Sequence, residues 1–449
     1  MNVSVDTIAA IATPPGKGGI GIIRVSGPKA QAISQQLFER IIPARSAQLL
    51  PFTDTDGSIL DRGIAIFFPA PHSYTGEHVL ELQAHGGPIL LELLLNRVLK
   101  MGARLARPGE FTERAFLNDK LDLTQAEAVA DLIDSSSRQA VLAAARSLDG
   151  SFSAIVSDLQ QQLTYLRSYI EAALDFPEEE VDFLSDRQLT QAMQALQKQI
   201  AATLATLRTG RLLKEGISVV ILGSPNAGKS SLLNRLAGRE SAIVTEIAGT
   251  TRDVLREHIH LDGLPLHIID TAGLRESEDV IEQEGVRRAW QEVDRADHVL
   301  LVVDEQKGVT TADQKIIETV PKDKPLDILH NKIDLGTEEA KRFQQGNVTH
   351  IYLSAKTGAG MELLIDHLEK SVGYEQTGET TVIARRRHIV ALNQVGAKVD
   401  SAAEQLQQGA GELAAEELRS AQLALSELTG ELSSEDLLGE IFSSFCIGK

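Results

Sequence analysis

The clearest chemistry in the sequence lies in a glycine-rich stretch at residues 223–230. It reads Gly223-Ser-Pro-Asn-Ala-Gly-Lys-Ser230, with a strand-like apolar run before it and a helical pattern after it. Strand, loop and helix in this order are the context of a phosphate-binding loop, whose glycines let backbone N–H groups point at a phosphate. Lys229 would act catalytically by neutralising the β- and γ-phosphates, and the Ser230 hydroxyl would ligate Mg²⁺. The predicted nucleotide contacts here are Asn226, Ala227, Gly228, Lys229, Ser230 and Ser231.

Two later motifs select the base. Asn331-Lys-Ile-Asp334 follows a strand-like run, and the Asp334 carboxylate can accept hydrogen bonds from N1 and N2 of guanine. Adenine offers no such pair of donors, so the predicted ligand is GTP. Asn331 would brace the loop and reach the base edge. The predicted base-contacting residues are Asn331, Lys332 and Asp334, followed by Ser354, Ala355 and Lys356 after a further strand.

Two segments between these motifs could respond to the γ-phosphate. Asp270 stands at a strand end, where it can hold the Mg²⁺ shell through water, and Gly273 can turn its N–H toward the γ-phosphate. In the earlier segment, Thr250 and Thr251 are the expected sensors, with Thr251 on Mg²⁺. The predicted contacts of the two segments are Thr245, Glu246, Ile247, Ala248, Gly249, Thr250, Thr251, Asp270, Thr271, Ala272 and Gly273.

The residue after Gly273 departs from GTPases of the Ras type, which place a water-orienting Gln there. This chain has Leu274, whose side chain cannot align a water molecule. The attacking water must therefore be organised from elsewhere, and the acidic stretch that begins at Glu276 is within reach. The sequence alone does not choose among Glu278, Glu282 and Glu284, and a solvated helix acid is the alternative for each.

The surrounding elements predict a multidomain α+β and α/β protein. Short β-like runs and one apolar helix indicate a small amino-terminal α+β domain over residues 1–118. Apolar residues at helical spacing on both sides of the nucleotide motifs favour one split helical bundle over 119–213 and 377–449. A Ras-like P-loop G domain over 214–376 would be inserted into it. The alternative is two unrelated helical pieces, because periodicity does not show which faces meet.

Composition narrows the remaining possibilities. The 449 residues are 43% hydrophobic, which is typical of a folded globular protein. The net charge of −19 excludes binding of nucleic acid by positive charge spread over the whole chain, but a local basic patch is compatible with it. The single cysteine, Cys446, excludes a disulfide within the chain. No apolar run approaches the ~18 residues of a membrane span. We therefore expect a cytoplasmic protein with no membrane contact.

Distinctive short stretches also lie outside the nucleotide motifs, at 6–16, 18–24, 73–77, 81–83, 85–87, 107–112, 120–122 and the final Cys446-Ile-Gly-Lys449. With these stretches, the sequence resembles the MnmE family of tRNA-modification GTPases, also called TrmE, over its whole length and not only in the G domain. The resemblance implies an amino-terminal domain that forms a homodimer and binds 5-formyltetrahydrofolate or a related one-carbon folate. By the same resemblance, Arg24, Glu81, Lys120 and Lys449 would line the folate pocket.

The resemblance also implies how the GTPase works. Members of the family are K⁺-stimulated and are activated when two G domains meet, so Asn226, Thr245, Ile247 and Thr250 would ligate K⁺. A K⁺ against the phosphates would supply the charge that an arginine finger supplies elsewhere. Glu282 matches the family residue that positions the attacking water.

The implied product is a tRNA with an aminomethyl or carboxymethylaminomethyl group at C5 of the wobble uridine. The FAD-containing partner MnmG would join the chain in a heterotetramer or larger complex; the amine donor and the tRNAs stay open. Cys446 could be a nucleophile toward the pyrimidine or a small buried residue that docks the tail. The competing function is a ribosome-assembly GTPase, which the folate-type amino-terminal domain and the Cys446–Lys449 tail disfavour.

Overall fold

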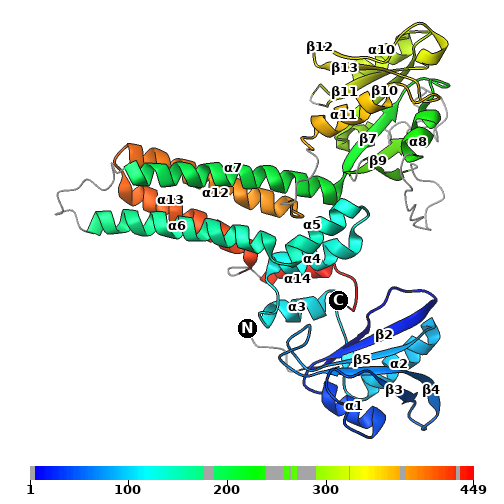
Figure 1. The fold of residues 1–449 in the computed structure, drawn as a ribbon, viewed down its shortest axis with the longest axis vertical. Coiled ribbons are helices and arrows are strands. Elements are labelled where there is room, and N and C mark those ends of the chain that lie inside the picture. Colours follow the sequence, from blue (N-terminus) through cyan, green and yellow to red (C-terminus); the bar gives the residue numbers. More distant parts are fainter. Residues whose placement is uncertain are drawn as a thin grey trace. The chain divides into compact units, whose positions relative to one another are not determined.

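The computed structural model describes residues 6–175, 187–238, 256–261, 264–270, 290–322, 324–374, 381–430 and 435–448 (Figure 1). The chain divides into two compact units. The first combines Met1–Ala130, Ser147–Gln197 and Gln394–Lys449, and the second combines Asp131–Arg146 with Lys198–Asn393. Each unit therefore draws on segments from both sides of an insertion, and each is described separately below.

The first unit begins with a six-stranded sheet. In sheet order its strands are β3 (Gln48–Thr53), β4 (Ile59–Phe68), β5 (Val79–Gly86), β2 (Gly18–Ser26), β1 (Ile8–Ile11) and β6 (Arg104–Leu105). All neighbouring pairs are antiparallel except β1 with β6. Side chains on one face, including Leu50, Ala65 and Leu82, form a core with helices α1 (Ala30–Phe38) and α2 (Pro88–Lys100). The alternation along each strand leaves Arg24 and Glu81 on the opposite face.

A partly buried ion-pair network holds helix α3 (Glu110–Leu117) to this domain. The Arg114 guanidinium lies 2.7 Å from Asp6 Oδ1, 3.1 Å from Glu77 Oε1 and 3.0 Å from Glu110 Oε1. Burial raises the pKa of Glu110, but hydrogen bonds from Arg104, the Arg107 backbone and Arg114 outweigh it and lower the pKa to about 2. The carboxylate therefore stays ionised and paired, as a buried charge must.

Helices from opposite sides of the insertion pack together in the first unit. On α6 (Ser151–Asp175) the buried residues Val156, Leu159, Leu163, Leu166 and Ile170 follow helical spacing. This stripe packs against α13 (Gly411–Thr429), which lies alongside α6 (Figure 1). Gln422 of α13 donates to Thr164 at 2.6 Å and accepts from Arg167 at 2.6 Å. The predicted split bundle is confirmed, and the alternative of two unrelated helical pieces is wrong.

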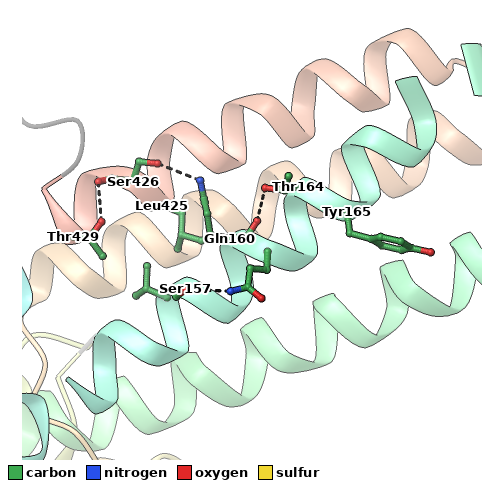
Figure 2. A pocket seen from close by; sticks show the side chains of 9 residues that line it. Ser157, Gln160, Thr164, Tyr165, Leu425, Ser426 and Thr429 are labelled. Carbon is green, nitrogen blue, oxygen red and sulfur yellow. Dashed lines mark hydrogen bonds between the residues drawn. The ribbon is translucent and has the colours of Figure 1, made fainter. Parts of the chain in front are cut away.

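Further helices among the described residues, outside the nucleotide motifs, are α4 (Leu123–Asp134), α5 (Arg138–Leu148), α7 (Arg187–Glu215), α12 (Arg386–Gln407) and α14 (Glu435–Ser443). Between α6 and α13 runs a groove of about 410 Å³, whose lining side chains are all uncharged (Figure 2). Its polar lining residues are Ser157, Gln160, Gln161, Thr164, Tyr165, Ser426 and Thr429. None of the residues predicted to bind a ligand lines this groove. No helix among the described residues has the length and apolar character to cross a bilayer.

The second unit is built on a seven-stranded sheet. In sheet order its strands are β12 (Arg342–Gln345), β13 (Val348–Leu353), β11 (Leu326–Asn331), β10 (His298–Asp304), β7 (Ile217–Leu222), β9 (Leu264–Asp270) and β8 (Arg256–Leu261). The five central strands are parallel, and the edge strands β12 and β8 are antiparallel to their neighbours. Strands β7, β10 and β11 are buried along nearly their whole length, as is usual for a parallel sheet covered on both faces.

Three helices of this unit matter for the site: α8 (Lys229–Ala237), α10 (Thr311–Thr319) and α11 (Met361–Ser371). The carboxyl ends of parallel strands meet at one edge of a sheet, where ligands bind in open α/β folds. The loops after β7, β11 and β13 therefore converge, and these are the loops that carry the predicted phosphate and guanine motifs.

Candidate functional site

The loop between β7 and α8 has a backbone that two glycines make possible. Gly223 has φ of 140°, and a Cβ there would lie 2.3 Å from the carbonyl oxygen of Val302 on β10. Gly228, with φ of 103°, is the residue before α8, and Asn226 between them also has positive φ, 66°. The loop is thus pressed against the neighbouring strand and leads straight into a helix amino terminus, whose free N–H groups favour an anion.

Lys229 and Ser230 lie on the first turn of α8. The Lys229 ammonium donates to the carbonyl oxygens of Gly223, at 2.7 Å, and Ser224, at 3.3 Å, and so lies across the loop. The Ser230 side chain is exposed beside it. A cation, an exposed hydroxyl and a helix amino terminus in one place fit a phosphate chain that shares a hard cation such as Mg²⁺.

Asn331 connects three loops. Its Nδ2 donates to the carbonyl oxygen of Ala227 at 2.9 Å, and its Oδ1 accepts from the backbone N–H of Ala355 at 3.0 Å. The residue is only 2% exposed. One buried amide therefore holds the phosphate-binding loop, its own loop and the loop after β13 in fixed relation.

The predicted guanine acceptor is tied to the same place. The buried Ser354 hydroxyl donates to Oδ1 of Asp334 at 2.6 Å and accepts from the backbone N–H of Thr357 at 3.2 Å. Asp334 is otherwise exposed, and so is Lys356, whose carbonyl oxygen accepts from Arg235 at 3.2 Å. The Ser354 contact fixes one oxygen of the carboxylate while the side chain stays open to a ligand.

Two acidic residues that the sequence did not indicate support these loops. Lys332, with φ of 71°, donates to Asp304 Oδ2 at 2.6 Å, and this hydrogen bond lowers the pKa of the Asp304 carboxyl. The buried Asp313 accepts from the Ser224 hydroxyl at 2.9 Å and forms a capping box with Thr310 at the start of α10. A capping-box spacing was readable in the sequence, but its link to the phosphate-binding loop is long-range.

Several predicted residues lie outside the described part of the chain. They are Thr245, Glu246, Ile247, Ala248, Gly249, Thr250, Thr251, Thr271, Ala272, Gly273, Leu274, Glu276, Glu278, Glu282, Glu284 and Lys449. Asp270 is the last residue of β9, paired with Ile221 of β7. Within the described ranges, no group of three His, Cys, Asp or Glu side chains is arranged to hold a metal ion.

The amino-terminal site brings Arg24 and Glu81 together on the second face of the six-stranded sheet. They are register partners on β2 and β5, and Nε of Arg24 donates to Glu81 Oε1 at 3.0 Å. The guanidinium lies 5.6 Å from the ring centre of Tyr74 and 5.8 Å from that of Phe111, two rings that the sequence did not indicate. Lys120 is exposed. A cation, a carboxylate and aromatic rings fit a planar ligand that carries both donors and a carboxylate.

The carboxyl-terminal tail reaches this site. Arg24 Nη1 donates to the carbonyl oxygen of Gly448 at 3.4 Å, and a Cβ on Gly448 would lie 2.4 Å from the carbonyl oxygen of Ile11. The Cys446 side chain is exposed, whereas Phe442 and Phe445 are buried with Leu123. Of the two alternatives for Cys446, the small buried residue that docks the tail is contradicted by this exposure, and the buried phenylalanines supply that packing. The nucleophile alternative stays a prediction.

The chain is similar along its whole length to known proteins. A family model for the MnmE helical domain matches residues 123–446, and one for the GTP-binding protein TrmE N-terminus matches residues 7–120. The tRNA modification GTPase MnmE of Proteus mirabilis is 56% identical over 459 residues, which cover 99% of this chain and 100% of that protein. The protein of the same name from Hydrogenovibrio crunogenus is 55% identical over 445 residues, 99% of each chain. Among solved structures, Aquifex aeolicus Era is 27% identical, with a TM-score of 0.28, over 40% of this chain and 66% of that chain.

Proposed function

This chain belongs to the MnmE family of tRNA modification GTPases, and from that premise we propose that it hydrolyses GTP to drive modification at C5 of the wobble uridine. It is a GTP hydrolase of tRNA modification. The added group would be of the aminomethyl or carboxymethylaminomethyl type, and the FAD-containing partner MnmG would act with this chain in a heterotetramer or larger complex. The cytoplasm would be the site of action.

The observation that carries the modification chemistry is the meeting of Arg24, Glu81 and the Gly448 carbonyl at one place. A one-carbon folate has a pterin edge with donors for a carboxylate and a glutamate tail for cations. Arg24, Glu81, Lys120 and Lys449 would hold it, in a homodimerising domain over residues 1–118. The folate would supply the one-carbon unit, while the chain's own residues bind and orient it.

In the G domain, proposed over residues 214–376, the residues that would bind GTP and Mg²⁺ have distinct physical roles. Asp334 would accept from guanine N1 and N2 with its carboxylate steadied by Ser354, and Asn331 would hold the three loops around the nucleotide. Lys229 would neutralise phosphate charge at the amino terminus of α8. Mg²⁺, held by Ser230 and Thr251, would supply further positive charge to the phosphates. Asp270 would hold the Mg²⁺ shell through water.

We expect the chain to be needed for one class of modified nucleoside. In cells that lack this protein, mass spectrometry of nucleosides from total tRNA should show loss of the C5-modified wobble uridine. The wild-type gene should restore the nucleoside, and a Lys229→Ala gene should not, because the phosphates would lose their counter-charge. An unchanged nucleoside profile in the deletion strain would instead favour the ribosome-assembly function.

Potassium should stimulate GTP turnover. Asn226 is exposed in the phosphate-binding loop, where its carbonyl oxygen could join Thr245, Ile247 and Thr250 around a K⁺. The cation would offset transition-state charge when two G domains meet, and Glu282 would position the water. Turnover in KCl should exceed turnover in NaCl at equal ionic strength by about tenfold or more, since charge stabilisation of this kind has large effects. Equal rates in the two salts would remove the K⁺ role of Asn226.

A further inference from the structure

A hydrogen-bonded chain of side chains joins the two strands that carry the guanine loops. His330 on β11 directly precedes Asn331, and His350 lies on the neighbouring strand β13, four residues before Ser354. Nε2 of His330 lies 3.0 Å from Nδ1 of His350, and Nδ1 of His330 lies 2.7 Å from Glu305 Oε2. His330 is 6% exposed. Three titratable groups are therefore linked in series beside the proposed base site.

The three groups have few ways to share protons. The Glu305 carboxylate accepts, so Nδ1 of His330 carries a proton and donates. In the neutral pair, Nε2 of His330 then accepts from Nδ1–H of His350. With one added proton on the imidazole pair, Nε2 of His330 donates to Nδ1 of His350 while Nδ1 of His330 still donates to Glu305. Both states keep both hydrogen bonds, but a second proton would set two N–H donors against each other and break the link between the imidazoles.

The surroundings hold the rings in place and disfavour the second proton. Tyr352 stacks on His330 with ring centres 4.2 Å apart and planes 5° apart, and Phe343 of β12 stacks on His350 at 5.0 Å and 3°. Burial, followed by the nearby charge of His330, lowers the pKa of His350. The charged groups near the two imidazoles are Asp304 at the end of β10, Glu305 directly after it, Lys332 after β11, and Glu338 and Lys341 before β12.

The hydrogen-bonded side chains of Glu305, His330 and His350 are also coupled to the backbone of the guanine loop. Glu305, which holds His330, donates its own backbone N–H to the carbonyl oxygen of Asn331 at 2.9 Å. The Lys332–Asp304 hydrogen bond joins the same two loops one residue further along. A change at the imidazole pair therefore acts on the segment that positions Asn331 and, through β13, on the loop of Ser354.

We propose that His330, His350 and Glu305 are positioning residues for guanine-nucleotide binding, and that a second proton on the imidazole pair loosens the two guanine loops and weakens binding. The proposal rests on the assignment of Asn331, Asp334 and Ser354 to the guanine site. It adds to that site a sensitivity to acid that lies outside the ligand-contacting residues themselves.

The test is the pH dependence of GDP affinity, measured by equilibrium binding to a fluorescent GDP analogue at pH 7.5 and pH 4.5, because the lowered pKa of His350 requires strong acid for the second proton. His350→Asn keeps a hydrogen-bonding atom near the position of Nδ1 but cannot titrate. GDP affinity should fall between the two pH values by a factor that is about threefold to tenfold larger in the wild type than in His350→Asn. This difference corresponds to the loss of about one hydrogen bond. Protonation of the GDP phosphates affects both proteins alike and cancels in this comparison.

Two further variants make the result specific. His350→Ala removes the link at every pH, so its affinity at pH 7.5 should fall about threefold to tenfold, and asparagine should restore it. His367→Gln is the matched control, because His367 lies on α11, bound to Asp327 at the other end of β11. It should keep the wild-type pH profile.

The proposal would be overturned if His350→Asn kept the wild-type profile, or if His367→Gln flattened the profile equally. Failure of the guanine site itself has a separate signature. In that case Asp334→Asn would leave the preference for guanine over xanthine unchanged, whatever the histidine variants do.

Discussion

Asp334→Asn should turn the guanine site into a xanthine site. An asparagine can accept from N1–H of the base but cannot also accept from the guanine 2-amino group, because its second atom is an NH₂ donor. The charge-assisted hydrogen bonds are lost, and the asparagine NH₂ and the guanine 2-amino group face each other as two donors. Together these effects should lower GTP affinity by about 10²- to 10⁴-fold. Xanthine has a carbonyl at C2, which the asparagine NH₂ can donate to, so affinity for xanthosine triphosphate should rise. Nucleotide competition at equilibrium measures both changes.

The local structure suits this substitution. Asp334 accepts from the Ser354 hydroxyl through Oδ1, and an asparagine Oδ1 can accept the same hydrogen bond, so the loop should keep its conformation. Asp304→Asn is the matched control, because it makes the same chemical change one loop away, where the carboxylate accepts from Lys332. It should leave base selection unchanged. A retained preference for GTP in Asp334→Asn would remove Asp334 from the base site.

The parts of the site that the sequence predicts are local in the chain. The phosphate-binding loop needs glycines, a lysine and a hydroxyl within a few residues, between a strand and a helix, and β7 and α8 stand on either side of it as expected. The amphipathic stripe of α6 is equally local, since it follows from the helical period alone. In both cases the structure depends on residues that are close together in the chain, so their spacing in the sequence is enough to predict it.

The parts that the sequence did not predict depend on strand order and register. The Ser224–Asp313 hydrogen bond joins residues 89 positions apart, and the imidazole pair forms only because β11 and β13 are neighbours in parallel register. The Arg114 network likewise includes the carboxylates of Asp6 and Glu77, which lie 108 and 37 positions from Arg114. No spacing rule connects these residues, because the distance between them is set by the tertiary fold.

Gly228→Ala should disable nucleotide binding through a collision that the sequence does not reveal. A Cβ at this position would lie 2.2 Å from Nδ2 of Asn331, and the backbone φ of 103° is itself strained for alanine. Asn331 would have to move, losing its hydrogen bond to the Ala227 carbonyl oxygen. The strain and the lost buried hydrogen bond together should lower GTP affinity by about a hundredfold, as measured by equilibrium binding.

Gly308→Ala separates this collision from a general effect of glycine replacement. Gly308 lies in the same unit with φ of 62°, and a Cβ there would meet no atom within 4 Å. Its cost should be backbone strain of about 1 kcal/mol, visible as a lower midpoint of thermal unfolding with normal GTP affinity. If both variants lost affinity equally, the collision with Asn331 would not be the cause.

A double-mutant cycle then locates the collision. Asn331→Ser removes the amide that the new methyl group would strike, so adding Gly228→Ala to it should cost much less affinity than adding Gly228→Ala to the wild type. Residues in contact show such non-additive effects, whereas distant residues do not. Additive losses would mean that Gly228 acts on the phosphates alone. Strong non-additivity would show that the phosphate-binding loop and the guanine loop are held together by one buried amide.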